Sequence, residues 1–140
     1  MTEVTLGAVG ESLATAELLR RGFLVAAPVV DMDGFDLLAG KGPNQYHRIQ
    51  VKTSRQPTTR PETSTDAASY RFNSKARTDS DFFILCCLMH KSFYVIPTGK
   101  MHSSARLSGD GSGGSKYEKY LSAFNLLSNK PSTGVDNDSS

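Results

Sequence analysis

The sequence has little of what marks membrane, secreted and zinc-binding proteins. No apolar run approaches the roughly 18 residues of a membrane span, so we expect no membrane partner. The first five residues lack a basic start and a long apolar core, so we expect no signal peptide and a cytoplasmic protein. The two cysteines, Cys86 and Cys87, are adjacent in an apolar run, which is typical of a reduced core and does not fit the CxxC spacing of zinc sites.

Histidine and net charge are also sparse. His47, His90 and His102 are scattered without ligand spacing, so we expect them at the surface and not in a metal site. A formal charge of +2 is too small to indicate a polyanionic partner by itself.

The distribution of charge is more informative than its sum. Residues 47–77 hold seven cations and two acids, with Tyr70 and Phe72 between them. Such a segment is either a solvated loop without a partner or a surface for a phosphate backbone. The residues that we expect to contact DNA are Arg48, Arg55, Arg71, Lys75 and Arg77.

The chain opens with a helical pattern over residues 6–21. Its apolar stripe consists of Leu6, Val9, Leu13, Ala14 and Leu18. Two glycines, Gly7 and Gly10, are small enough to let this helix approach another backbone closely.

Six short runs then predict strands, at residues 23–28, 35–39, 46–53, 69–73, 81–89 and 92–97. Residues 81–89 are the most apolar and predict a central strand buried on both faces. Residues 31–34, 40–44, 54–68 and 98–114 have the composition of turns and loops. Residues 115–127 predict a second helix, with Ser115 and Glu118 as a capping box. We therefore expect one α+β domain over residues 1–128, a mixed sheet flanked by a helix from each end, and a disordered tail over 129–140.

A candidate site emerges where the second and third strands would form a hairpin. Asp36 begins one strand, while Gln50 and Lys52 share a face of the next because side chains alternate along a strand. These three side chains would converge at one end of the sheet. The alternative is that Gln50 and Lys52 are ordinary exposed strand residues.

An acid, an amide oxygen and an ammonium group suit metal-assisted phosphodiester hydrolysis. Asp36 is the first metal ligand in this interpretation, and Gln50 and the Val51 carbonyl supply further oxygens for Mg²⁺ or Mn²⁺. Lys52 orients the attacking water or stabilises the developing phosphorane charge. Glu11 restores the negative charge that Gln50 lacks if the first helix packs beside the site, and otherwise it is a solvated helix acid.

Together these residues resemble the PD-(D/E)XK nuclease superfamily, nearest to the group I intron homing endonucleases of that fold and, behind them, the archaeal Holliday-junction resolvases. The resemblance covers about residues 6–97. The matching pieces are 7–11 with 13–14, 22–23, Pro28, 36–38, 49–53, 81–83 and 94–97.

The resemblance implies a restriction-endonuclease-like sheet core flanked by helices, with the site at one end of the sheet. It assigns Asp36 as the metal-binding acid, Gln50 to the (D/E) position, Lys52 as the motif lysine and Glu11 as the helix acid. Two residues depart from the pattern: Phe35 replaces the Pro before the Asp, and Gln50 replaces an acid, as it does in the intron-encoded branch.

Three hypotheses follow. The first is a Mg²⁺-dependent DNA endonuclease from a homing, phage or repair context, acting as a dimer or tetramer if it cuts both strands. The second is a catalytically inactive PD-(D/E)XK-like module that binds DNA or protein, as the neutral Gln50 suggests. The third is a toxin, antitoxin or anti-restriction protein that uses the fold as a scaffold.

Overall fold

An amphipathic helix opens the chain and packs on the sheet. The computed structural model describes residues 1–31, 34–59, 67–73, 79–102 and 104–129, and α1 spans Glu3–Arg20. Thr2 caps the helix, because its Oγ1 accepts a hydrogen bond from the Thr5 N–H at 3.1 Å. The residues that α1 buries repeat at every fourth position: Leu6, Gly10, Ala14 and Leu18. The prediction for Leu13 was wrong, since its side chain is 38% exposed and Gly10 lies on the packed face instead.

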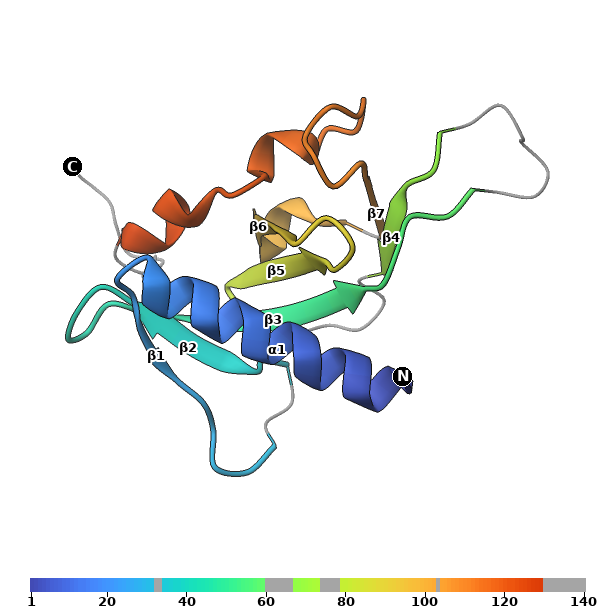
Figure 1. The fold of residues 1–140 in the computed structure, drawn as a ribbon. Coiled ribbons are helices and arrows are strands. Elements are labelled where there is room, and N and C mark those ends of the chain that lie inside the picture. Colours follow the sequence, from blue (N-terminus) through green and yellow to red (C-terminus); the bar gives the residue numbers. More distant parts are fainter. Residues whose placement is uncertain (32–33, 60–66, 74–78, 103, 130–140) are drawn as a thin grey trace.

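Five strands form the main sheet. They are β1 (Leu24–Ala26), β2 (Leu37–Gly40), β3 (Tyr46–Ser54), β5 (Phe82–Cys87) and β6 (Ser92–Pro97). Their order is β1-β2-β3-β5-β6, with β3 and β5 parallel and the other neighbours antiparallel. The expected mixed α+β sheet and the hairpin of β2 with β3 are therefore present (Figure 1).

The two faces of this sheet carry separate cores. Ala14 and Leu18 of α1 pack with Ile49, Val51 and Ile84 on one face. Phe83 and Leu85 face the other way and are covered by the second sheet. As expected, β5 is buried on both faces, since the free cysteines Cys86 and Cys87 belong to opposite cores. Burial raises the pKa of the Cys86 thiol to about 11 and that of the Cys87 thiol to about 12.

The second sheet pairs β4 (Tyr70–Asn73) with β7 (Ser104–Leu107) in antiparallel register. It lies near the C-terminal end of β3 (Figure 1). The prediction of a loop through residues 98–114 was wrong here, because β7 and the 3-10 turn η1 (Thr98–Lys100) both fall within it. In a strand of four residues the alternation of apolar and polar side chains is too short to be recognised in the sequence, and the pairing partner β4 is distant in the chain.

The C-terminal segment contradicts the predicted second helix. In place of a helix over 115–127 the chain forms the short 3-10 turns η2 (Glu118–Tyr120) and η3 (Phe124–Ser128), so α1 is the single α-helix in the described part of the chain. Glu118 does not cap a helix: its buried carboxylate accepts hydrogen bonds from the Tyr94 hydroxyl at 2.7 Å and the Ser108 N–H at 2.8 Å. Ser122 then takes a positive φ of 54°, which breaks the helical path.

His47 also differs from its prediction. Its side chain is buried, its ring meets Phe82 edge-on, and its Nε2 lies 2.7 Å from the Asn129 carbonyl oxygen. This contact ties the end of the described chain to β3. Asn129 is the first residue of the predicted tail, 129–140, and the rest of that tail lies outside the described residues. Within the described ranges, no helix has the length and apolar character needed to cross a bilayer.

Candidate active site

Asp36 lies where β2 separates from β3. Its backbone N–H donates to the Ile49 carbonyl at 2.7 Å, and its Oδ2 accepts from the Val51 N–H at 2.8 Å. The registered β2–β3 pairs end at Leu37–Ile49, so the Asp36 side chain satisfies the Val51 N–H where no strand neighbour does. Gly34, with φ +90°, has the left-handed conformation that turns the chain into this position.

Glu11 and Asp36 meet in a shared hollow. The hollow measures about 190 Å³ and lies between α1, the segment after β1 and the start of β2. Asp31 and Phe35 also line it. The predicted approach of the helix-one acid to the strand acid is therefore present in the fold, because α1 crosses β3 closely enough to bring Glu11 to that edge.

Both carboxyl groups hold their protons more tightly than usual. Burial is the main cause that raises the pKa of Glu11, and the negative charges of Asp36 and Asp31 raise it further. Burial also raises the pKa of Asp36, although the Val51 hydrogen bond and the positive charge of Lys52 oppose this rise. Asp31 raises the pKa of both carboxyl groups, and Asp36 also raises that of Glu11, so the acids around this hollow form a site that favours a cation.

Gln50 lies on β3, the strand that pairs with β2 next to Asp36. Continuing the β2–β3 register by one step places it opposite Asp36. Its Oε1 is buried and has no hydrogen-bond partner among the described residues, so one oxygen acceptor on this strand is left unused. Gln50 does not line the hollow itself. The predicted roles of Gln50 and of the Val51 carbonyl as metal ligands stay predictions.

Lys52 follows two residues later on the same face of β3. It is partly buried, with its Nζ 5.8 Å from the centre of the Phe83 ring, and its charge acts on Asp36. The cation is thus close enough to act on Asp36, but it forms no direct ion pair with Asp36 or Glu11 among the described residues.

The donor set fits a hard divalent cation with few protein ligands. In the described ranges, no three His, Cys, Asp or Glu side chains cluster closely enough to hold a metal ion. A site here would consist of Glu11, Asp36 and neutral oxygens such as Gln50 Oε1, which is left unpaired. Mg²⁺ is commonly bound through one or two carboxylates with water completing its shell, so this set suffices.

The predicted DNA-binding cations have different surroundings. Arg48 is held by Asp81, with Nη2 3.1 Å from Oδ1, so its charge is locally balanced. Arg55 donates to the Met1 carbonyl at 2.8 Å, and Arg71 has a buried Nη2 without a hydrogen-bond partner. Lys75 and Arg77 lie outside the described residues.

Asp31 is a site residue that the sequence reasoning missed. It lies in the hollow with Glu11 and Asp36 and raises the pKa of both. The only feature of the sequence that could have indicated Asp31 is its place five residues before Asp36. An Asp in a run that ends in Asp-Gly is equally well explained as a turn residue.

Comparisons with known proteins agree with this architecture. A family model described as PD-(D/E)XK endonuclease matches residues 1–122. The fold is similar to the solved structure of a bacterial homing endonuclease, I-Ssp6803I, with a TM-score of 0.70 and 19% sequence identity over 90% of this chain and 92% of that chain. No curated protein matches the sequence. The likeness confirms the predicted restriction-endonuclease-like fold, and the family match over most of the chain shows that the protein belongs to the PD-(D/E)XK endonuclease family.

Proposed function

We propose that the protein is a Mg²⁺- or Mn²⁺-dependent DNA endonuclease whose site is the hollow between α1 and the start of β2. One observation carries the proposal: Glu11 and Asp36 share this hollow, each with a raised pKa, beside the cation of Lys52. Membership of an endonuclease family supports DNA as the substrate, and nucleases of that family generally use divalent metal ions.

Each side chain has a distinct role in this proposal. Glu11 and Asp36 would hold the metal, with Gln50 Oε1 and the Val51 carbonyl as neutral donors. The metal, when bound, supplies charge neutralisation at the phosphate and a more acidic water. Asp36 is fixed for its role by the Val51 N–H. Lys52 donates toward the attacked phosphate or its water, where negative charge develops.

The similar solved structure is that of a homing endonuclease, and we propose this context for the present chain ahead of phage or junction-repair roles. Breaking a duplex requires two cuts on strands of opposite direction. A symmetric dimer or tetramer supplies two such sites, so we propose a homo-oligomer, which sedimentation of the full chain measures directly.

The test is cleavage of supercoiled plasmid and linear duplex with Mg²⁺ or Mn²⁺. We expect the wild type to nick or cut, and Asp36→Asn and Lys52→Met to lose about 10²-fold or more in rate. Arg20→Gln is the control, since Arg20 pairs with Glu17 on the exposed surface of α1. Wild-type rates in the two site variants would refute the assignments.

A second candidate is a binding module without catalysis, and the neutral residue at position 50 favours it. Calorimetry separates the two. The nuclease binds Mg²⁺ with a heat that Asp36→Asn abolishes, whereas the module binds DNA with no Asp36-dependent metal heat and no cleavage.

A further inference from the structure

The outer face of the β4–β7 ribbon carries two arginines directly opposite each other. Tyr70 and Phe72 alternate with Arg71 and point into the core, so Arg71 faces outward. The register pairs Arg71 with Arg106 on β7. Like charges directly opposite on neighbouring strands destabilise a sheet, so this pair is costly unless an anion lies between or above them.

The described part of the chain supplies no such anion. Its ion pairs join Glu17 to Arg20 and Arg21, and Asp81 to Arg48, and none involves Arg71 or Arg106. The Nη2 of Arg71 and the Oγ of Ser69 are both buried without hydrogen-bond partners. Buried donors without acceptors are costly, so neither atom offsets the repulsion between the two arginines within the described residues.

Two hollows that the ribbon arginines line add more cations and hydroxyl groups. Arg71 shares a hollow of about 340 Å³ with Arg55 and the N-terminal turn of α1, where Glu3 is the single acid. Arg106 shares a hollow of about 440 Å³ with Lys116, and this second hollow is also lined by Ser69, Ser104, Ser108 and Ser115.

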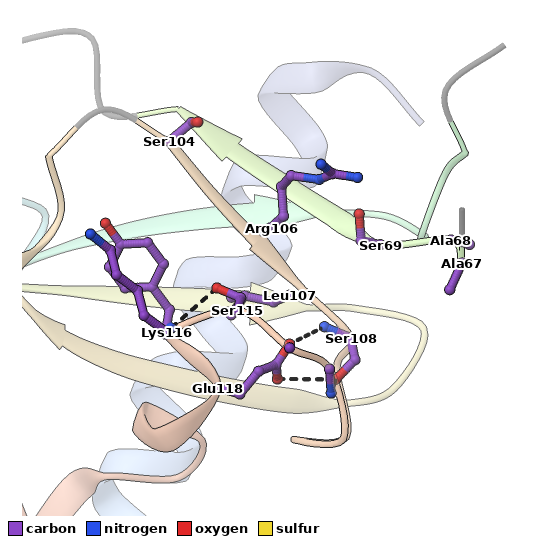
Figure 2. A pocket seen from close by; sticks show the side chains of 13 residues that line it. Ala67, Ala68, Ser69, Ser104, Arg106, Leu107, Ser108, Ser115, Lys116 and Glu118 are labelled. Atoms are coloured by element: carbon purple, nitrogen blue, oxygen red, sulfur yellow. Dashed lines mark hydrogen bonds between the residues drawn. The ribbon is translucent and has the colours of Figure 1, made fainter. Parts of the chain in front are cut away.

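The acid in the second hollow does not neutralise its cations. The Glu118 carboxylate accepts bonds from Ser108 and from the Tyr94 hydroxyl. Arg106 projects from β7 away from that carboxylate (Figure 2). Arg106 is half-buried, and no ion pair among the described residues neutralises its guanidinium.

The hollow that holds Arg71 begins one residue beyond Lys52 along β3. Thr53 and Ser54, which follow Lys52 on β3, line the hollow that holds Arg55 and Arg71. A polyanion seated at Lys52 would reach the ribbon by way of that hollow. Concave hollows lined by hydroxyls and cations suit phosphate groups, whereas reading base edges requires an element that protrudes into a groove.

We propose that the outer face of the β4–β7 ribbon binds the sugar-phosphate backbone of the DNA beyond the cleaved step, through Arg71, Arg106 and Lys116. The proposal rests on the proposed function, because it takes DNA as the ligand. It adds a second contact surface, independent of base sequence, that lengthens the footprint of the protein on one side of the cut.

The test compares Arg106→Gln with the matched control Arg20→Gln. The control removes the same charge at the C-terminal end of α1, whereas the N-terminal end of that helix lines the hollow with Arg71. Binding is measured by fluorescence anisotropy in EDTA, so that no cleavage occurs, over a series of salt concentrations. One duplex ends just beyond the cleaved step and another extends well past it. We expect Arg106→Gln to weaken binding of the long duplex by about tenfold, and to reduce the slope of log K against log salt by about one. The short duplex and the control variant should be unaffected.

Folding is checked in the same variants. Arg106→Gln relieves a like-charge contact, so its melting temperature should equal or exceed that of the wild type. Lys116→Gln, at an exposed residue, is the second variant and should also weaken the binding of the long duplex. Losses in affinity with preserved melting temperature support a binding role and not a structural one.

Two outcomes overturn the inference separately from the proposed function. If both variants bind the long duplex with wild-type affinity and salt slope while the wild type cleaves DNA, the ribbon surface is rejected and the nuclease stands. If the wild type binds but never cleaves, and Arg106→Gln still weakens binding, the surface stands and the nuclease is rejected. Absence of any DNA binding rejects both.

Discussion

Gly10 of α1 lies against Thr53 of β3 with no room for a β-carbon between them. A Cβ built on Gly10 would overlap the Thr53 Oγ1, whereas one built on Gly7 would meet nothing within 4 Å. Gly10 therefore sets how closely α1 crosses the sheet. Because Glu11 is the next residue, the same contact sets the position of the helix acid relative to Asp36.

Gly10→Ala should push α1 away from β3 and separate Glu11 from Asp36. We expect a destabilisation of about 2 kcal/mol or more and a large loss of DNA cleavage, measured by urea unfolding and plasmid nicking. Gly7→Ala is the matched control and should stabilise the protein by about 0.5–1 kcal/mol through helix propensity, with cleavage unchanged. Equal behaviour of the two alanine variants would contradict this account.

Asp36 should lower the stability of the metal-free protein at neutral pH. The pKa values of Asp36 and Glu11 are raised in the folded state, so the folded protein binds protons more tightly than the unfolded chain. The free energy of unfolding should therefore fall as the pH rises from about 4 through these raised values, and low pH should restore it. Asp36→Asn removes the charge, keeps an acceptor for the Val51 N–H, and should stabilise the protein at pH 7 by up to about 1 kcal/mol.

Asp110 provides a control of opposite sign. Hydrogen bonds from Ser112 lower its pKa to about 2, so its contribution to stability is present above the unfolded pKa and is lost as the pH falls toward 2. Asp110→Asn should therefore give no stabilisation at pH 7. Urea unfolding in EDTA at several pH values distinguishes the two variants, and a stabilised Asp110→Asn protein would argue against the site-specific explanation.

Local patterns in the sequence predict the strands and the chemistry that they carry. The acid at Asp36 and the alternation of Gln50 and Lys52 are readable because period-two alternation is a property of consecutive residues. Asp31 and Arg106 were not readable in the same way. Asp31 enters the hollow, and Arg106 meets Arg71, only through contacts between segments distant in the chain. The prediction of a C-terminal helix was wrong for the same reason. The local apolar periodicity favours a helix, but Glu118 instead accepts buried hydrogen bonds from Tyr94 and Ser108, which are distant in the chain.

The Mg²⁺ affinity of this site should begin to fall at a higher pH than that of a site built from carboxylates with ordinary pKa values. Both Glu11 and Asp36 must lose their protons to bind Mg²⁺, and their raised pKa values shift this requirement to higher pH. We expect the Mg²⁺ affinity, measured by calorimetry, to decline as the pH is lowered through these raised values, with protons released on binding. Glu11→Gln should reduce both the affinity and the proton release. A pH-independent affinity would place the metal elsewhere.

Lys52 should act on the reaction and not on the metal. Its charge faces Asp36 but it offers no ligand to a cation, so Lys52→Met should reduce the cleavage rate by about 10²–10³-fold. The Mg²⁺ affinity should be retained or slightly increased, because removing a nearby positive charge favours cation binding. Calorimetry on the same preparation measures this second quantity. A variant that lost metal binding along with activity would show that Lys52 has a structural role instead.

Glu118 should hold the C-terminal segment on the sheet. Its carboxylate accepts from the Tyr94 hydroxyl, the Ser108 N–H and the Ser108 hydroxyl, and all three donors lose that acceptor in Glu118→Ala. Since leaving buried donors unpaired is costly, we expect a loss of about 2–4 kcal/mol in unfolding free energy. Hydrogen exchange should show opening of η2 and η3 before the main sheet, because those turns depend on this anchor. Glu118→Gln keeps an oxygen acceptor of the same shape and should lose less, whereas equal losses in the two variants would mean that the charge, and not the hydrogen bonding, holds the segment.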